Sequence, residues 1–447
     1  MSRIEKDSKI VIVGAGVFGL STAEYLLKRG YTAITILDRS AELPAPDAAS
    51  CDINKIVRSS YSDPFYTKLA KDAVDLWRDQ NQWGDTYHDF FVRLFQHATQ
   101  IPDALFRRYR SGVFVISSGG SGYGDGAYQN DVALGVRLKD LKTPEEIKSI
   151  FPPGVKTASF EGASGYINYD GGWAFASQGV AVLLERVKKL GAVVYPGKGA
   201  SDLIKAEDGT TKGVKTTDGS SYDADLVVIA SGSWTPSTFP KLNLYDKCLA
   251  TGQVLATIQL TPEEAERYRN TPVILSFESG FYSFPPNADN IVKFAIHGRG
   301  YLHQPNNGPS TPRTKLSDGQ DGLRIPKQAV KDLRAGLATV YPELSQKPFV
   351  TTRLCWYNDS PDDDFVIGYH PTDSRLVLAT SGSGHAYKFL PNIGRLVADA
   401  IEGKLEPELV KKFALDRASN DHLPWRSDGS SRPLNLAELC TADDLLP

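Results

Sequence analysis

Short apolar runs and helical repeats alternate at the start of the chain. Lys9–Val13 is an apolar run long enough for one buried strand, and residues 33–37 form a second such run. Between them, apolar residues recur at helical spacing until Gly30 closes the helix. The pattern therefore predicts a strand, a glycine turn, a helix and a second strand that ends at Asp38.

Similar units return in the middle and near the end of the chain. Residues 225–229 and 375–380 are apolar runs that each lead into a glycine-containing turn, and an amphipathic pattern at 180–190 predicts a helix before the first of them. Apolar runs at 252–260 and 273–277, and a pair at 281–284 and 291–297, predict strands of another domain. We therefore expect two interleaved domains rather than two consecutive ones.

Local signals predict several helix ends and loops. Asp63 is expected to cap a helix that begins at Pro64, and Thr143 with Glu146 forms a capping box for another. Residues 328–341 predict a helix, and apolar and aromatic runs from 88 to 116 predict strands. Glycines and serines at Gly119–Gly126 predict a mobile surface loop, and the proline-rich segment Tyr301–Arg324 predicts a long loop that could cover a pocket.

The first turn carries a dinucleotide-binding pattern. It reads Gly14-Ala15-Gly16-Val17-Phe18-Gly19. In this pattern the first glycine makes the tight turn, the second allows backbone to approach a pyrophosphate, and the third allows the helix to pack on the strand. The helix N-terminus favours phosphate, and an acid placed like Asp38, 19 residues after Gly19, accepts ribose hydroxyl hydrogen bonds. The pattern does not separate FAD from NAD.

Composition narrows the class of protein. The chain has 447 residues, enough for two domains, and a net charge of −3 without a basic stripe, so nucleic acid is not an expected partner. Its four cysteines show neither a disulfide framework nor a zinc pattern, and no metal is expected. No apolar run suits a membrane span, and residues 1–9 lack a signal region. We expect an intracellular, cytoplasmic monomer; a peroxisomal location stays open, although the last residues are not a targeting tripeptide.

Three motifs spread over most of the chain carry a resemblance to a known family. Gly14–Gly19 with Asp38, Asp170–Trp173, and Leu354–Tyr357 followed by residues 361–367 are similar to segments of the FAD-dependent amine oxidases of the monomeric sarcosine oxidase and fructosyl amino acid oxidase family. The resemblance implies an α/β fold, with a Rossmann-type FAD-binding domain (1–62, 155–240, 350–415) interleaved with an α+β substrate domain on a mainly antiparallel sheet (63–154, 241–349). Residues 416–447 are then a C-terminal segment near the active site.

The resemblance also implies roles for single residues. Cys355 is the expected covalent anchor of FAD through an 8α-S-cysteinyl thioether, although a buried structural cysteine is the alternative. Lys293 is the expected oxygen-activating lysine, since a fixed cation stabilises the charge that develops on oxygen. By its pattern alone, Lys293 is an outward-facing strand residue. Further cofactor contacts are expected at Arg39, Asn54, Lys55, Ile56, Gly384, His385, Lys388 and Phe389.

Substrate binding is expected at a pair of cations. Arg58 and Lys388 would hold an amino-acid carboxylate and orient its α-carbon; the alternatives are surface charges or a link to FAD phosphate. His297 and Tyr282 are further candidates, and Glu278 lies where fructosyl oxidases place a substrate-binding acid. The C-terminal arginine of those oxidases has no clean counterpart, although Arg426 or Arg432 could replace it.

The implied activity is an FAD-dependent oxidation of a secondary amine such as an N-methyl amino acid, pipecolate or saccharopine. Hydride passes from the carbon next to nitrogen to flavin N5, giving an imine, and O2 is reduced to H2O2. Arg58 and His297 favour this branch, while Glu278 favours a fructosyl amino acid or peptide oxidase, and a natural-product tailoring oxidase is related to both. An NAD-linked dehydrogenase and a flavin-binding protein without turnover are the alternatives from other classes.

Overall fold

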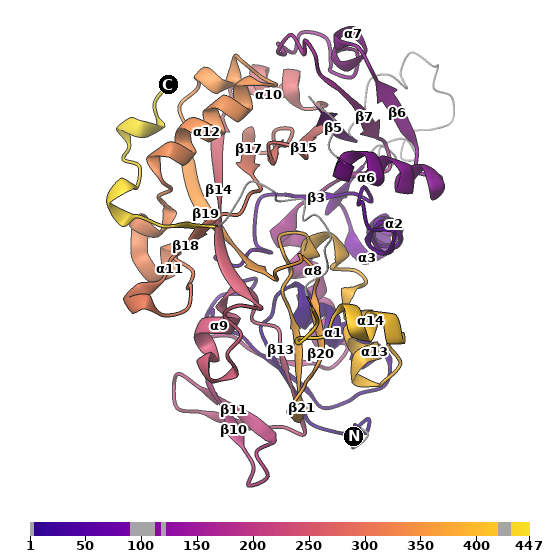
Figure 1. The fold of residues 1–447 in the computed structure, drawn as a ribbon, viewed down its shortest axis with the longest axis vertical. Coiled ribbons are helices and arrows are strands. Elements are labelled where there is room, and N and C mark those ends of the chain that lie inside the picture. Colours follow the sequence, from indigo (N-terminus) through magenta and orange to yellow (C-terminus); the bar gives the residue numbers. More distant parts are fainter. Residues whose placement is uncertain (1–3, 90–111, 118–121, 419–430) are drawn as a thin grey trace.

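The computed structural model describes residues 4–89, 112–117, 122–418 and 431–447, and two large sheets dominate it. The smaller of these has six strands, and its helices occupy the lower half of Figure 1. The strand order is β20 (Val366–His370), β21 (Asp373–Thr380), β13 (Leu226–Ile229), β1 (Ile10–Val13), β2 (Ile34–Leu37) and β9 (Val193–Tyr195). All neighbours are parallel except β20 and β21. The sequence-based prediction of a Rossmann-type α/β unit is confirmed.

Alternate residues of the central strand β1 explain how this sheet is covered. Ile10 and Ile12 pack with helices α1 (Val17–Lys28), α8 (Ala176–Lys189) and α13 (Ile393–Ile401) on one face. Val11 and Val13 point to the other face, toward a three-stranded sheet. That sheet consists of β10 (Ala200–Lys205), β11 (Thr211–Thr216) and β12 (Ser221–Asp223). Because both faces are covered, the central strands β1 and β13 are apolar along their whole length.

The larger sheet has ten strands and is mainly antiparallel, as predicted. Its order is β22 (Arg432–Pro433), β18 (Tyr301–Leu302), β14 (Leu249–Gln259), β17 (Ile291–Ile296), β16 (Phe281–Ser283), β15 (Val273–Ser276), β5 (Val113–Ser117), β7 (Ser164–Asn168) and β6 (Leu138–Leu141), with β19 (Thr351–Asp359) paired to β14. The apolar side of α12 (Lys327–Ala338) packs on this sheet. A third, small sheet joins β3 (Lys55–Val57), β8 (Gly172–Ala174) and β4 (Tyr87–His88).

The remaining helices begin largely where capping residues predict. Asp63 accepts a hydrogen bond from the Phe65 N–H at 2.8 Å, and Thr143 and Glu146 form the predicted capping box. These helices are α2 (Pro64–Trp77), α3 (Gln80–Trp83), α6 (Gly122–Ala133), α7 (Pro144–Lys148), α9 (Thr235–Thr238), α10 (Pro262–Tyr268), α11 (Lys315–Asp318) and α14 (Pro407–Lys412).

Two sequence-based predictions need correction. Residues 122–126 of the predicted Gly119–Gly126 loop begin helix α6, and 119–121 lie outside the described residues. Tertiary contacts override the weak helix propensity: Asn130 donates to the Tyr61 carbonyl at 3.0 Å, and Asp131 accepts from Ser60 Oγ at 2.6 Å. The segment Tyr301–Arg324, predicted to be a long loop, contains β18, α11 and two 3-10 helices at Pro305–Asn307 and Gly319–Leu323.

The predicted domain boundaries also differ from the strand pairing. β7 and the whole of β19 fall within segments assigned to the nucleotide domain, yet both belong to the larger sheet. The run of register pairs between β19 and β14 extends from Thr351 to Asp359. β19 therefore belongs to the larger sheet along its whole length. Of the strands predicted between 88 and 116, β4 and β5 lie at the two ends, and 90–111 lie outside the described residues.

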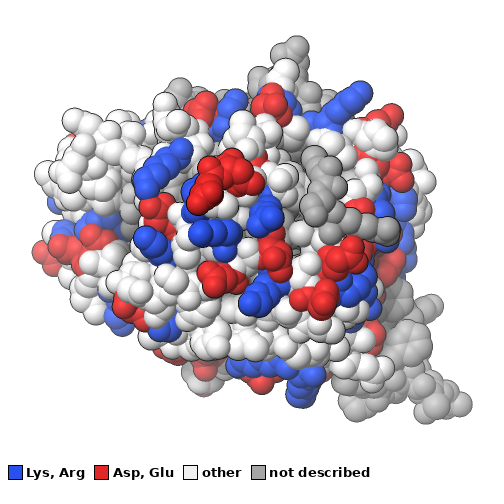
Figure 2. Space-filling view, turned by 90° about the horizontal axis from the view of Figure 1, so that it is seen from below, with Lys and Arg blue, Asp and Glu red and all other residues white. Residues whose placement is uncertain are grey.

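Surface charge and helix length bear on the classes of protein considered above. On the face in Figure 2, Lys and Arg side chains are intermixed with Asp and Glu rather than gathered in one stripe. Within the described part of the chain, no helix is long and apolar enough to cross a membrane.

Candidate active site

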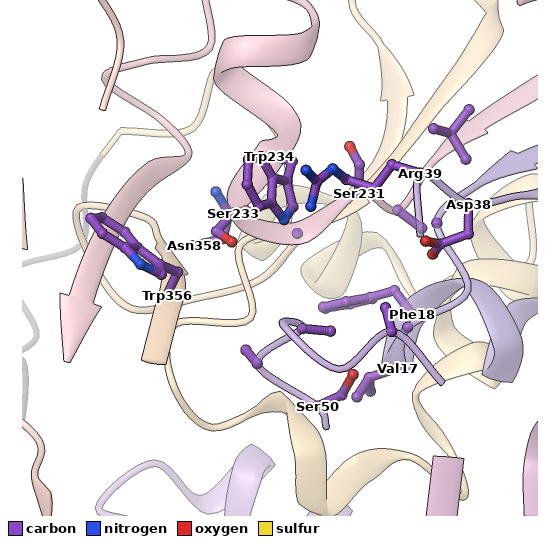
Figure 3. A pocket seen from close by; sticks show the side chains of 18 of the residues that line it. Val17, Phe18, Asp38, Arg39, Ser50, Ser231, Ser233, Trp234, Trp356 and Asn358 are labelled. Atoms are coloured by element: carbon purple, nitrogen blue, oxygen red, sulfur yellow. The ribbon is translucent and has the colours of Figure 1, made fainter. Parts of the chain in front are cut away.

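A cavity of about 580 Å³ lies along the carboxyl ends of the central parallel strands. Its walls come from the turn after β1, the end of β2, the turn after β13, the loop 45–50 and the last residues of β19. In open α/β sheets, ligands bind in the crevice beyond the carboxyl ends of the strands. Figure 3 shows this cavity, with Asp38 and Arg39 on one side and Trp356 and Asn358 on another.

The glycine turn has the geometry that its sequence predicts. Gly14 has a φ of +111°, and a Cβ there would lie 2.4 Å from the Ala230 carbonyl oxygen. A Cβ on Gly19 would lie 1.9 Å from the Gly14 oxygen, so helix and strand touch. Gly16 lines the cavity and caps α1 without any side-chain hydrogen bond. The first N–H groups of α1 are therefore available to an anion at the cavity wall.

Asp38 closes the same end of the cavity. Its carboxylate accepts hydrogen bonds from the N–H groups of Ala15 and Ser40, each at 2.8 Å. Burial raises the pKa of Asp38 above its ordinary value, although these N–H groups oppose the shift. The carboxylate thus ties the glycine turn to the end of β2, in the place where an acid would meet a ribose.

Arg39 is the next residue and lines the cavity just after the end of β2. Its guanidinium carbon lies 3.6 Å from the centre of the Trp234 ring, and it forms an ion pair with Asp47 at 2.8 Å. Figure 3 shows Arg39 extended toward Trp234. These contacts make a flat, partly charged wall at this end of the cavity.

Lys55 and the end of β19 form the other part of the wall. Lys55, Trp356, Tyr357 and Gly384 line the cavity, and Lys55 Nζ donates a hydrogen bond to Cys355 Sγ at 3.5 Å. Burial alone would lower the pKa of Lys55, but the Cys355 sulfur and the Asp52 carboxylate raise it above its ordinary value. Cys355 therefore sits beside a cationic group that lines the cavity.

Lys293 is buried next to Lys55, at the same Asp52 carboxylate. Its side chain is 0% exposed, and Nζ lies 2.6 Å from Asp52 Oδ2 and 2.7 Å from the Asn54 carbonyl oxygen. Burial lowers the pKa of Lys293 to about 8, although Asp52 opposes the shift. The pattern alone suggested an outward-facing strand residue; instead, the inner face of the sheet here packs against the loop before β3.

Arg58 and Lys388 meet at Tyr61. Lys388 Nζ donates to the Tyr61 hydroxyl at 2.6 Å and to the His385 carbonyl at 2.8 Å, and the Arg58 guanidinium carbon lies 4.8 Å from the Tyr61 ring centre. Tyr61 OH also pairs with His385 Nδ1 at 3.1 Å. Burial, and then the Arg58 charge, lowers the pKa of Lys388 well below its ordinary value. The structure thus brings the two predicted cations together.

The other candidates divide into buried and exposed groups. His297 Nδ1 lies 3.4 Å from the Tyr357 hydroxyl, and burial raises the pKa of Tyr282 to about 12, although the Lys55 charge opposes it. Glu278 is exposed and accepts a hydrogen bond from Ser117 Oγ at 2.7 Å. Arg432 is exposed on β22, and Arg426 lies outside the described residues.

Not every predicted cofactor residue faces the cavity. Gly14, Gly16, Val17, Phe18, Asp38, Arg39, Lys55 and Gly384 line it. Ala15, Gly19, Asn54, Ile56, Cys355, His385, Lys388 and Phe389 support these residues from behind or lie beyond the cavity's lining.

The sequence-based analysis missed several cavity and cluster residues. Asp47, Ser50 and Trp234 line the cavity, and Asp52 and Tyr61 bind the candidate lysines. Asp47 and Ser50 lie in a loop without periodicity. Asp52 stands three residues before Lys55, so a carboxylate near two predicted cations was the one available signal.

Comparison with known proteins gives the class of this chain. Residues 9–400 match the family model described as FAD dependent oxidoreductase. The chain belongs to this family, and FAD is its cofactor.

Several relatives and solved structures narrow the comparison. The chain is 30% identical to L-saccharopine oxidase of Schizosaccharomyces pombe, over 93% of this chain and 95% of that protein. It is 24% identical to monomeric sarcosine oxidase of Bacillus sp., over 91% and 96%. The fructosyl peptide oxidase structure from E. terrenum superimposes with a TM-score of 0.82 at 28% identity, covering 98% of each chain.

The cavity fits FAD on its own features. The glycine turn, where Gly14 leaves no room for a side chain, faces the cavity. The uncapped start of α1 lines the cavity, and the buried Asp38 closes one end of it. Arg39 and Trp234 offer a flat wall at the same end, and Lys55 lies near Cys355 in another part. These groups suit a pyrophosphate, a ribose and an extended ring system.

Proposed function

We propose that the protein is an FAD-dependent oxidase of secondary amines, acting on an N-substituted amino acid such as an N-methyl amino acid, pipecolate or saccharopine. One observation carries the proposal: buried cations cluster beyond the FAD cavity, with Lys293 on one side and Arg58 and Lys388 on another. Lys388 is buried against neutral partners, the Tyr61 hydroxyl and the His385 carbonyl, so a bound anion would stabilise its charged form. The similarity to L-saccharopine oxidase and monomeric sarcosine oxidase supports the same reading.

Arg58 and Lys388 bind the substrate carboxylate in this proposal. Arg58 is 2% exposed and Lys388 is 5% exposed, so a carboxylate there would form charge-assisted hydrogen bonds away from water. Such a clamp orients the carbon next to nitrogen toward the reacting ring. When bound, FAD supplies the acceptor for the hydride from that carbon, leaving an imine, and its two electrons then reduce O2 to H2O2.

Lys293 provides the fixed cation for oxygen reduction. Its ammonium lies in a water-excluded site, where a charge stabilises a developing anion more strongly than it would in water. The pKa of about 8 leaves most of the amine protonated at neutral pH. The Tyr282 phenol, near Lys55, stays neutral because burial raises its pKa to about 12.

Cys355 is proposed as the covalent anchor of FAD, through an 8α-S-cysteinyl bond. The hydrogen bond from Lys55 to Cys355 Sγ supports this role, because it holds the sulfur next to a residue that lines the FAD cavity. We also propose that the protein acts as a cytoplasmic monomer, as its balanced charge suggests.

A second candidate is a fructosyl amino acid or peptide oxidase. The similarity to the fructosyl peptide oxidase structure favours it, as does the placement of Glu278 beside Phe277, whose ring lies 4.9 Å from the Arg58 guanidinium. Glu278 is exposed, however, whereas Arg58 is buried, so we place the carboxylate clamp first.

A peroxide-release screen on the flavin-loaded protein tests the choice. The panel contains sarcosine, pipecolate, saccharopine, N-methyl amino acids, fructosyl-valine and fructosyl-lysine. Peroxide from the first four groups supports the proposal. Peroxide from the fructosyl compounds alone favours the second candidate. If no compound of the panel yields peroxide, both candidate functions are contradicted.

A further inference from the structure

Asp52 is the one carboxylate at the centre of the buried lysine cluster in the described part of the chain. Its Oδ2 lies 2.6 Å from Lys293 Nζ and 3.0 Å from Lys55 Nζ, and 3.6 Å from a terminal guanidinium nitrogen of Arg353. The Ile53 N–H donates to the other oxygen, Oδ1, at 2.8 Å. We propose that Asp52 is a positioning residue that holds the Lys293 ammonium in place and in its charged form.

Three elements converge on this carboxylate. Lys293 comes from β17 of the larger sheet, Lys55 from β3 of the small sheet, and Arg353 from β19. Asp52 itself stands in the loop before β3. A single acidic side chain therefore fixes how these parts meet next to the FAD cavity.

The balance of buried charges makes Asp52 the group that keeps the Lys293 amine protonated. The side chains of Lys293 and Asp52 are 0% and 4% exposed, so neither charge can be stabilised by water. Burial alone would raise the pKa of Asp52, but Lys293, Lys55 and Arg353 hold it well below its ordinary range. The carboxylate is thus ionised at any working pH, and it opposes the loss of the proton from Lys293.

The other groups that face Lys293 cannot replace Asp52. Lys55 repels the Lys293 charge, the Asn54 carbonyl is neutral, and the Phe284 ring centre lies 5.0 Å from Nζ. Cys355 and Tyr282 stand farther back, against Lys55. Without Asp52, the buried lysine would give up its proton at a lower pH, and its position would no longer be fixed.

This inference rests on the proposed role of Lys293 in oxygen reduction. Its first test therefore avoids the amine: the flavin-loaded protein is reduced with dithionite, then mixed with O2 between pH 6 and 9, and reoxidation is followed by absorbance. The wild-type rate should fall as the pH rises through about 8, where Lys293 loses its proton. In Asp52→Asn the fall should lie at least about one pH unit lower, which is a roughly five-fold slower rate at pH 8.

Asp373→Asn is the matched control. Asp373 is buried in an ion pair with Lys205 at 2.7 Å, on the edge of the nucleotide-binding side and outside the cavity wall. The Asp373→Asn variant removes the same kind of buried charge, and it should leave the pH profile of reoxidation unchanged. A wild-type profile in Asp52→Asn would overturn the inference.

A second readout needs no activity. Thermal unfolding of the flavin-loaded protein is measured for Asp52→Asn, Lys293→Met and the double variant. Asp52→Asn should lower Tm by several degrees because it strands a buried cation, and adding Lys293→Met should restore part of that loss. Additive losses would contradict the pairing. If the cycle shows coupling while no amine yields peroxide, the pairing stands and the proposed function fails.

Discussion

At the scale of single residues, the main physical feature of the site is a set of cationic side chains that are buried away from water. Lys293, Lys388 and Arg58 are each at least nine-tenths buried, and two of them have a lowered pKa. Proteins rarely bury such groups without a partner or a task, so perturbed pKa values mark candidate functional sites.

Replacing Lys293 tests the oxygen step separately from amine oxidation. In Lys293→Met, flavin reoxidation by O2 should be slower by about 100-fold, because a preorganised charge at a developing anion contributes on that order. Anaerobic reduction by the amine should change far less. Stopped-flow absorbance measures both half-reactions; equal slowing of the two would contradict the assigned role.

Replacing Cys355 tests the covalent link. In Cys355→Ser, acid precipitation should release the yellow flavin into the supernatant, whereas the wild type should retain it in the pellet. Cys248→Ser is the control, since Cys248 is 0% exposed on the nucleotide-binding side and should not affect retention. Flavin that stays bound in Cys355→Ser would place the link at another residue.

Lys388 should couple substrate binding to a proton. Its pKa is lowered by burial and by Arg58, so above that pKa the free amine is neutral. A bound carboxylate stabilises the ammonium and raises the pKa, so substrate binding draws in a proton and KM should rise with pH by up to about ten-fold per unit. Proton uptake in weakly buffered solution measures this directly. In Lys388→Met the uptake should vanish; undiminished uptake would assign it elsewhere.

At the scale of elements, the strand–turn–helix unit that begins at β1 was the part most readable from sequence. Its strand, glycines, helix and terminal acid all lie where the pattern places them, because each rests on local sterics and periodicity. The glycine-rich start of α6 was misread, since its helix depends on contacts of Asn130 and Asp131 with residues far away in sequence. Asp52 and Tyr61 were missed for the same reason.

Two glycines of this unit should respond differently to the same change. In Gly19→Ala, the new Cβ would lie 1.9 Å from the Gly14 oxygen, so the turn must shift and the flavin-free protein should lose several degrees of Tm. In Gly16→Ala, the new Cβ meets only Ser50 Oγ at 3.8 Å, so Tm should hold while FAD binding weakens. Differential scanning fluorimetry with and without FAD makes the comparison. Equal Tm losses would contradict the assigned division of roles.

At the scale of the whole molecule, the site lies where two sheets meet. The six-stranded sheet and its first helix form one part of the cavity, and β19 of the larger sheet contributes Trp356, Tyr357 and Asn358 to another. Chain order could predict this interleaving but not the side-chain pairs across it. The predicted domain boundaries differ from the strand pairing at β7 and β19 for that reason. Strand pairing, and not motif position, decides to which sheet a segment belongs.

Anaerobic mixing followed by air tests the central claim most directly. We predict that the flavin of the loaded protein loses its yellow colour when it is mixed without oxygen with a secondary amine of the panel that carries a carboxylate. Admitting O2 should restore the colour and release one H2O2 for each flavin reduced. A flavin that no such amine reduces, or a reduced flavin that O2 does not reoxidise, would contradict an amine oxidase.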